Sequence, residues 1–256
     1  MLKISHISKT FNPGTVNEKK AIEDLSLELK KGDFATIIGS NGAGKSTLFN
    51  AICGDFLTDA GSIELDGRDI TFMPQHARAK EIGRLYQDPM RGTAPGMTIE
   101  ENLALAAGKG GWLSHTTRQE KERFREELKK LDIGLEERMS HPVGLLSGGQ
   151  RQRVCIGEAL MTNPGLLVAD EAVSALDVTI QAQILELLEQ LKEEMGLSIL
   201  FISHDMRVVY QLCDRVMIMK DGTIVESGDV DTVYFSPQHE YTKELLEAAG
   251  IGEDEA

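Results

Sequence analysis

One stretch of this chain combines residue types at a spacing that suits phosphate binding: Gly39-Ser40-Asn41-Gly42-Ala43-Gly44-Lys45-Ser46-Thr47. It fits the P-loop pattern G-x-x-x-x-G-K-[ST]. The glycines let the loop curl so that backbone N–H groups point at phosphate oxygens, and a following helix N-terminus adds partial positive charge. Lys45 would reach the β- and γ-phosphates, and the Ser46 hydroxyl would ligate Mg²⁺. An ordinary glycine-rich turn is the alternative, but the flanking sequence favours a nucleoside triphosphate site.

Two adjacent carboxylates follow a second apolar run. The residues Leu166-Leu167-Val168-Ala169 predict a buried strand with Asp170 at its tip. In a chain with a P-loop, such an aspartate holds Mg²⁺, usually through water. Glu171 comes one residue later and is aimed differently, so that it could polarise a water that attacks the γ-phosphate. A helix N-cap is the alternative for this Asp-Glu pair.

A third stretch, Leu146-Ser147-Gly148-Gly149-Gln150, precedes a predicted helix over residues 151–161. Ser147 can cap that helix, and the two glycines leave bare N–H groups facing outward. A capped loop alone would explain this stretch. Because the chain already has one phosphate site, we expect instead that the Ser-Gly-Gly of one chain closes over the nucleotide held by another.

The elements that must position these residues follow from hydrophobic periodicity. Residues 2–8 and 21–30 alternate as half-buried antiparallel strands do, and the β-branched run Phe34–Ile38 predicts a buried strand directly before the P-loop. An apolar helical face follows the loop and stops at Gly54. Next come a strand over 61–67, a short helix over 75–81, and a strand over 83–86 that leads to Gln87.

The next segment has a different character. Residues 88–97 form a loop, Thr98-Ile99-Glu100-Glu101 opens a helix with a capping box, and 116–131 form an amphipathic surface helix. We interpret 88–163 as a helical insertion. Afterwards the sheet resumes, with a helix over 179–195, a buried strand over 198–202 and a hairpin around Asp221-Gly222. Strands that alternate with helices predict an α/β fold with a mainly parallel sheet.

The bulk composition agrees with a globular protein. The chain has 256 residues, of which 41% are hydrophobic and 27% charged, and a net charge of −14. That charge argues against a surface that coats DNA or RNA. No apolar run is long enough to span a membrane, and the first residues lack the apolar core of a signal peptide, so we expect a cytoplasmic protein. Cys53, Cys155 and Cys213 are far apart, which favours buried reduced thiols.

In order along the chain, these stretches resemble the motifs of the ATP-binding cassette (ABC) ATPases, specifically the nucleotide-binding subunit of an importer. The similarity runs from Walker A at Gly39–Thr47 and the Q-loop at Gln87 to the signature at 146–150, Walker B at Leu166–Asp170, the catalytic base at Glu171, the D-loop at Ser174-Ala175-Leu176-Asp177 and the switch histidine at His204. Phe11 falls where the family keeps an adenine-stacking aromatic. A hairpin or core aromatic is the alternative for that residue.

The resemblance implies a single ABC ATPase domain over 1–256, of the P-loop NTPase fold. A RecA-like core with an antiparallel β lobe would cover 1–87 and 164–256, and a helical lobe 88–163. It also implies a head-to-tail dimer that sandwiches Mg-ATP between Walker A of one subunit and the signature of the other. Gln87 would sense Mg²⁺, and His204 would position water with Glu171. Expected partners are a second ATPase subunit and a transmembrane permease at the cytoplasmic face of the inner membrane, and no nucleic acid.

The two halves resemble different branches of that family. The first half, especially Asp88–Pro95 and Thr98–Leu103, resembles ATPases of tryptophan/tyrosine-type amino-acid importers. From about Arg151 onward, Asp177–Gln183 and Pro237–Thr242 look like ATPases of dipeptide/oligopeptide importers. We therefore hypothesise a recombinant joined near 146–153, with a natural lineage that combines both features as the alternative.

Three functions fit this reading. The first is the ATPase subunit of a transporter for an amino acid or peptide. The second is an engineered or stand-alone ABC module without a cognate permease. The third is a soluble ABC protein of DNA repair or translation, which the single cassette, the lack of a long coiled-coil insertion and the acidic balance disfavour.

Overall fold

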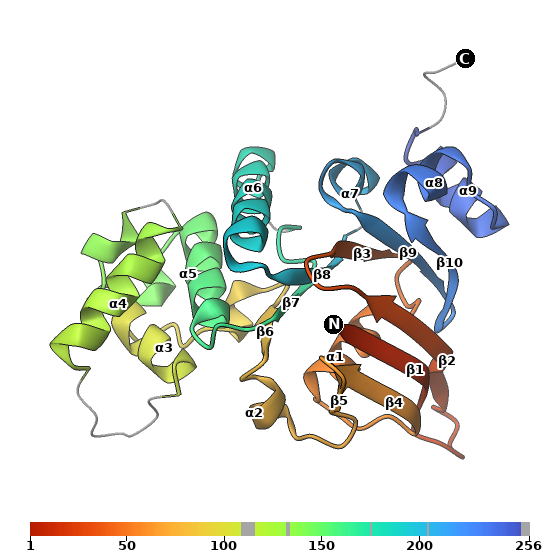
Figure 1. Cartoon of the computed structure of the whole chain (residues 1–256), viewed down its shortest axis with the longest axis horizontal. Helices are drawn as coiled ribbons and strands as arrows, with labels where there is room; N and C mark the ends of the chain where they lie inside the picture. The colour runs from red at the N-terminus through yellow and green to blue at the C-terminus, as the bar shows by residue number, and fades with distance from the viewer. Residues whose placement is uncertain (109–115, 132–133, 175, 204, 252–256) are drawn as a thin grey trace. The chain divides into compact units, whose positions relative to one another are not determined.

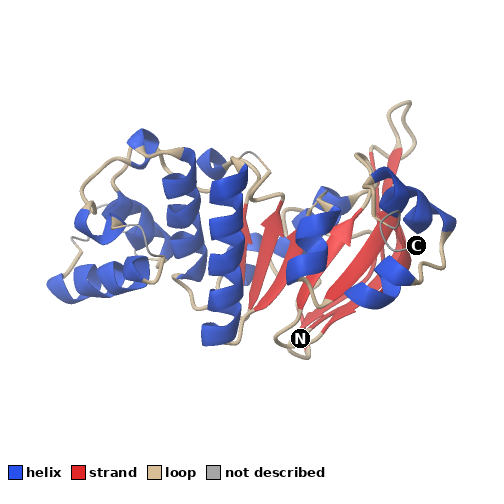
Figure 2. Cartoon of the chain, turned by 90° about the horizontal axis from the view of Figure 1, so that it is seen from above, coloured by secondary structure: helices blue, strands red, loops and turns tan. Residues whose placement is uncertain are grey.

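The computed structural model describes residues 1–108, 116–131, 134–174, 176–203 and 205–251. The chain divides into two compact units (Figure 1). Unit 1 consists of Met1–Arg78 and Lys192–Ala256, and unit 2 of Ala79–Leu191. Both units mix helices and strands (Figure 2), as the sequence predicts for an α/β protein. Each unit is described by itself below.

Unit 1 contains an antiparallel sheet with the strand order β2-β1-β4-β5. Its central strand β1 pairs with β2 on one side and β4 on the other, so that Leu2 lies opposite both Leu29 and Leu65. Alternate residues point inward, as in Leu25, Leu27 and Leu29. The half-buried strands predicted over 2–8 and 21–30 are confirmed as β1 Leu2–Phe11 and β2 Lys19–Leu29, and the strand predicted over 61–67 is confirmed as β4 Ala60–Leu65. The sheet also contains the two-residue strand β5 Arg68–Asp69, which was not predicted.

Unit 1 also contains the strand that leads into the P-loop. All five residues of β3 (Phe34–Ile38) are buried, because parallel strands β8 and β9 flank it on both sides. β9 continues into β10 as the predicted antiparallel hairpin. The remaining strands are β8 Ser198–Ile202, β9 Arg215–Lys220 and β10 Thr223–Asp229, and the helices are α1 Lys45–Cys53, α2 Gln75–Arg78, α7 Met206–Leu212, α8 Val230–Phe235 and α9 Glu240–Ala248.

A buried arginine of α2, Arg78, contacts the C-terminal end of the P-loop helix α1. No role for this residue was predicted from the sequence. Arg78 is 1% exposed. Its Nη1 donates to the carbonyl oxygens of Ala51 and Ile52 at 2.7 and 2.9 Å, in the last turn of α1. A cation suits the C-terminal carbonyls of a helix, which have no intrahelical donor. α2 ends at Arg78, so the helix predicted over 75–81 is shorter than expected, because this side chain turns inward to cap α1.

Unit 2 pairs two parallel strands, β6 (Ile82–Leu85) and β7 (Leu166–Asp170), with Leu85 opposite Ala169. The long helix α6 (Val178–Met195) begins in unit 2 and ends in unit 1. The segment 88–163, predicted as a helical insertion, lies within this unit, and its bounds as a separate lobe stay a prediction. The other elements are the 3₁₀ turns η1 Pro89–Arg91, η2 Leu135–Glu137 and η3 Val143–Leu145 and the helices α3 Ile99–Ala106, α4 Arg118–Lys129 and α5 Gly148–Leu160.

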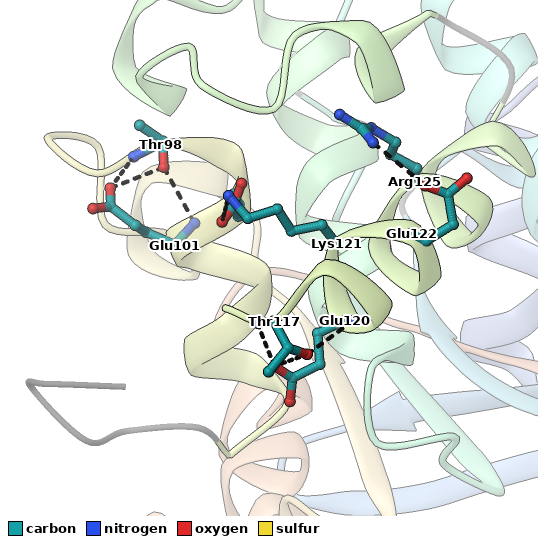
Figure 3. Close-up of polar contacts among 8 residues, drawn as sticks. Thr98, Glu101, Thr117, Glu120, Lys121, Glu122 and Arg125 are labelled. Atoms are coloured by element: carbon teal, nitrogen blue, oxygen red, sulfur yellow. Dashed lines mark hydrogen bonds and ion pairs between the residues drawn. The ribbon is translucent and has the colours of Figure 1, made fainter. Parts of the chain in front are cut away.

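Two capping boxes fix where α3 and α4 begin (Figure 3). The predicted box at α3 is confirmed: Glu101 N–H donates to the Thr98 hydroxyl oxygen at 3.2 Å, and Thr98 N–H donates to the Glu101 carboxylate at 2.8 Å. Thr117 and Glu120 form the same reciprocal pair at α4. These hydrogen bonds from Thr98 hold the pKa of the Glu101 carboxyl below its usual value. Each box satisfies N–H groups that a helix start leaves without a partner.

Two expectations from composition can be compared with the structure. The cysteines Cys53, Cys155 and Cys213 are all buried and unpaired with one another, as predicted. Within the described part of the chain, no helix is both long enough and apolar enough to cross a membrane.

Candidate functional site

The P-loop of unit 1 has a backbone that only glycine adopts at low cost. Gly42 and Gly44 have φ values of +88° and +105°, in the left-handed region. A Cβ on Gly44 would lie 2.4 Å from the carbonyl oxygen of Ala21, so a side chain does not fit there. Gly44 is also the N-cap of α1 and supplies no side-chain cap to the first turn. The helix N-terminus is thus open to an anion, as phosphate binding requires.

Lys45 folds back over the loop that precedes it. Its side chain is buried, and Nζ donates to the carbonyl oxygens of Gly39 at 2.7 Å and Ser40 at 3.1 Å. The ammonium group is therefore held inside the curl of the P-loop, where a bound phosphate would meet it. Ser46 is the exposed second residue of α1, and Thr47 is the partly exposed third. All the predicted phosphate-binding residues, from Gly39 to Thr47, lie in this single loop and helix start.

Phe11 lies at the end of β1, where its ring has structural neighbours. It packs edge-on against Phe56, with ring centroids 5.3 Å apart. The ammonium of Lys9 lies 5.8 Å from the Phe11 centroid and forms a 2.7 Å ion pair with Asp59. These contacts support the hairpin-aromatic alternative and fix the ring in place. Stacking of this ring on adenine stays a prediction.

Unit 2 brings together two of the predicted catalytic residues. Gln87 Nε2 donates to Glu171 Oε2 at 2.9 Å, although the two residues are 84 positions apart. The parallel pairing of β6 with β7 explains the contact, because Gln87 lies two residues after the carboxyl end of β6 and Glu171 directly after that of β7. Glu171 has a φ of +46°, which is uncommon for a residue with a side chain and is often found at functional sites.

A tight turn after Glu171 keeps it in that conformation. The Glu171 carbonyl accepts hydrogen bonds from the backbone N–H of Ser174 at 3.0 Å and from its hydroxyl at 2.9 Å. Asp170 is the last residue of β7, and Asp177 accepts from the N–H of Ile180 at 3.0 Å at the start of α6. The predicted switch residue His204 and Ala175 of the predicted D-loop lie outside the described residues.

The predicted signature stretch begins helix α5 with a reciprocal cap. Gln150 N–H donates to the Ser147 hydroxyl oxygen at 3.3 Å, and Ser147 N–H donates to Gln150 Oε1 at 3.1 Å. The predicted capping role of Ser147 is therefore confirmed. Gly149 is partly exposed and has a packing role, since a Cβ there would lie 2.6 Å from Ile180 of α6. Gly148 has more room, with the nearest Leu176 atom 3.5 Å from such a Cβ.

Arg151 holds the chain just before this cap, and the sequence analysis gave it no role. Its Nη2 donates to the carbonyl oxygens of Gly144 at 3.2 Å and Leu146 at 2.9 Å. One guanidinium thus fixes the backbone that leads into Ser147. The acceptor carbonyls lie seven and five positions earlier, in a segment outside helix α5, so helical periodicity does not indicate the contact.

A known protein family matches the part of the chain that carries most of these residues. The ABC transporter family matches residues 22–174, a range that includes the P-loop, Gln87, the Ser147–Gln150 cap and Glu171. The chain belongs to the ABC transporter family. The assignment of its P-loop as the Walker A motif, and of the α5 cap and the end of β7 as the signature and Walker B motifs, stays a prediction.

Individual ABC proteins are similar to this chain over most of its length. The chain is 38% identical to a peptidoglycan transport ATP-binding protein, YejF, of Agrobacterium fabrum, over 99% of this chain and 48% of that protein. It is 40% identical to the oligopeptide transport ATP-binding protein OppD of Bacillus subtilis, over 90% of this chain and 66% of that one. The chain therefore spans about half to two thirds of the length of these relatives.

A solved ABC structure confirms the α/β P-loop NTPase fold. It is the cassette MJ0796, described as a dimer in a post-hydrolysis state bound to ADP and Pi. It superposes with a TM-score of 0.78 at 29% identity, over 90% of this chain and 99% of that one.

The side chains that were predicted to hold Mg²⁺ are of a chemical type that suits this ion. Among the described residues no group of three or more His, Cys, Asp or Glu side chains could hold a metal. The predicted donors Ser46, Gln87 and Asp170 offer only oxygen atoms, and Mg²⁺ takes few protein oxygens beside phosphate and water. Because the amide nitrogen of Gln87 is bonded to Glu171, its oxygen is the atom left to face a cation.

The buried carboxyl of Glu158 is expected to make the stability of this cassette depend on pH. Burial raises the pKa of the Glu158 carboxyl to about 8, and its Oε1 has no hydrogen-bond partner among the described residues. The native state therefore keeps a proton that the unfolded chain releases near its ordinary value of 4.5. Because the native state binds more protons across this window, the free energy of unfolding falls as pH rises from about 5 to about 8.

We expect the free energy of unfolding to fall by on the order of 2 kcal/mol across this pH window. The decrease should be mostly absent in Glu158→Gln, because its side chain cannot ionise. Urea unfolding of both proteins at several pH values across the window measures it. Equal slopes in the two proteins would assign the pH dependence to other groups.

Proposed function

We propose that this chain is the ATP-binding and ATP-hydrolysing subunit of an ABC importer for a peptide-type solute. The observation that carries the proposal is the pairing of Gln87 with Glu171 in unit 2, in a chain whose unit 1 presents a complete Walker A loop. A carboxylate held at the end of one strand and oriented by an amide from the next is suited to activating water. The peptide class is supported by the relative named for oligopeptide transport.

In this proposal each group has a defined task. The N–H groups from Gly42 to Thr47 and the ammonium of Lys45 bind the β- and γ-phosphates, and Glu171 accepts a proton from the attacking water. Ser46, Gln87 and Asp170 would hold Mg²⁺, which on binding neutralises charge on the phosphate oxygens. The protein supplies mainly position and electrostatic stabilisation. His204 would contact the γ-phosphate, and Phe11 would stack on the adenine.

The active assembly is a head-to-tail dimer in which Ser147, Gly148, Gly149 and Gln150 of one chain close over the nucleotide of the other. The dimeric state described for MJ0796 with ADP and Pi supports this arrangement. So does the α5 N-terminus, where the cap uses the Ser147 and Gln150 side chains and leaves Gly148 exposed and Gly149 partly exposed. Asp177 would lie at the same interface.

The other partners are transmembrane permease subunits, which the helical lobe 88–163 would contact at the cytoplasmic face of the inner membrane. The join of an amino-acid-type half with a peptide-type half near 146–153 stays a hypothesis. A relative that aligns over 90% of the chain is named for oligopeptide transport, which favours a single peptide-type lineage. A stand-alone module without a permease is the second candidate function.

The test is Mg-ATP hydrolysis by the purified chain as a function of protein concentration. A site built from two chains should give a specific activity that rises with concentration and then saturates as the dimer forms. A specific activity that is constant down to nanomolar protein would contradict the composite site. Failure to bind ATP at all would refute the nucleotide site itself. Co-purification with a dipeptide permease rather than an amino-acid permease would decide the solute class.

A further inference from the structure

The C-terminal helix α9 contacts the Walker A loop through one tyrosine. The backbone N–H of Ser40 donates to the phenolic oxygen of Tyr241 at 2.9 Å, across 201 positions of sequence. Tyr241 is 9% exposed, so its ring is almost entirely packed inside unit 1. Ser40 itself is exposed, and this bond fixes its backbone at the point where the chain leaves β3 and enters the loop.

The neighbouring hairpin β9–β10 holds the same loop from a second direction. The N–H of Gly222 donates to the carbonyl of Ala43 at 2.8 Å. A Cβ on Gly39 would lie 2.2 Å from the carbonyl oxygen of Met219, so the loop and β9 are in close contact. The ammonium of Lys220 lies 4.6 Å from the centroid of the Tyr241 ring, a cation–π geometry that links hairpin and helix.

A carboxylate on β10 fixes the start of α9. Glu226 accepts hydrogen bonds from the N–H groups of Gln238 at 2.8 Å and His239 at 3.0 Å, and also from the Thr242 hydroxyl. His239 is the N-cap, and its Nδ1 accepts from the N–H of Tyr241 at 3.1 Å. The backbone of Tyr241 is thereby set by the strand beside it, and its phenol can reach Ser40 in only a narrow range of orientations.

We propose that Tyr241 is a positioning residue for the nucleotide site, and that α9 pre-orders the Walker A loop before nucleotide arrives. The inference deepens the proposed function and rests on it. Tyr241 contacts the loop backbone and not the reacting atoms, so it acts through Ser40. A loop whose entry is already fixed loses less conformational entropy when it binds phosphate. The smaller entropy loss increases the affinity for the nucleotide.

The test compares two tyrosine substitutions in unit 1. Tyr241→Phe removes only the hydroxyl that accepts from Ser40 and keeps the ring beneath Lys220. Tyr234→Phe is the matched control, since its hydroxyl donates to the Met206 carbonyl at 2.7 Å, in the contact between α8 and α7. We expect the dissociation constant for a fluorescent ATP analogue with Mg²⁺ to rise about three- to ten-fold in Tyr241→Phe and to stay unchanged in Tyr234→Phe.

Two further readouts separate positioning from general stability. Hydrogen exchange at the Ser40 amide should accelerate in Tyr241→Phe but not in Tyr234→Phe, at equal thermal stability. In steady-state hydrolysis the KM should rise with little change in kcat, as expected when ground state and transition state lose binding equally. Glu226→Ala, which loosens the start of α9, should weaken nucleotide binding in the same direction.

The outcomes distinguish this inference from the proposed function. If the wild-type chain binds nucleotide and Tyr241→Phe binds it equally well with unchanged exchange at Ser40, the positioning role is refuted and the ATPase proposal stands. If the wild-type chain does not bind Mg-nucleotide, the proposed site fails, and the inference fails with it.

Discussion

Glu171→Gln is expected to reduce the rate of ATP hydrolysis at least a hundred-fold while ATP binding is retained. The substitution keeps the size of the side chain but removes the carboxylate that would accept a proton, and such general bases contribute about 10²–10⁴ in rate. Gln87 can still donate to the amide oxygen of the new glutamine, so the local structure is preserved. Because the trapped nucleotide stays in place, we expect a stable ATP-bound dimer, measured by size-exclusion chromatography with light scattering at saturating Mg-ATP.

Glu158→Gln is the matched control, as a second glutamate in unit 2 that lies outside the proposed site. It should hydrolyse ATP at the wild-type rate. A Glu171→Gln protein that remains monomeric at saturating Mg-ATP, or that hydrolyses within a few-fold of wild type, would remove Glu171 from the role of base.

Lys45→Ala is expected to weaken Mg-ATP binding by about a hundred-fold or more. The substitution removes the buried ammonium that would face the β- and γ-phosphates, and charge-assisted hydrogen bonds to phosphate are among the strong ones. It also removes the hydrogen bonds from Nζ to the carbonyl oxygens of Gly39 and Ser40, so the curl of the loop loses internal contacts, although the Ser40 carbonyl still accepts from the N–H of Ala43 at 3.1 Å. Isothermal titration of the purified variant with Mg-ATP measures the effect.

Lys192→Ala provides the comparison for this experiment. Lys192 also belongs to unit 1 and forms a 2.7 Å ion pair with Asp214, a contact made far from the Walker A backbone in sequence. Its removal should leave nucleotide affinity unchanged and cost no more than about 1 kcal/mol of stability. Equal affinity in Lys45→Ala and wild type would show that the loop binds phosphate through its backbone alone.

Short-range sequence patterns determined the local conformation of several segments of this protein. The P-loop, the buried strand before it and the capping boxes at Thr98 and Ser147 all depend on residues a few positions apart. Within such distances, backbone sterics and local hydrogen bonds set the conformation directly. For the same reason the sequence alone indicated a nucleotide site, whereas the ABC cassette was indicated by the resemblance of several motifs to that family.

Helix ends were less predictable when a distant partner decided them. The helix predicted over 75–81 stops at Arg78, since the guanidinium of that residue is buried against the carbonyls of α1. A basic residue in the middle of a short predicted helix gives no signal of such a role. Only the packing of α1 in unit 1 supplies the carbonyl groups that require a cation there.

The tertiary structure alone decided which distant residues meet. Gln87 and Glu171 come together because β6 pairs in parallel with β7 in one particular register. Tyr241 reaches Ser40 because Glu226 fixes the start of α9 beside the hairpin that supports the loop. Such contacts depend on which strands are neighbours and on their register, and a linear sequence pattern does not encode either. Each contact is held in place by the free energy of the whole packed core, which must outweigh the conformational entropy lost on folding.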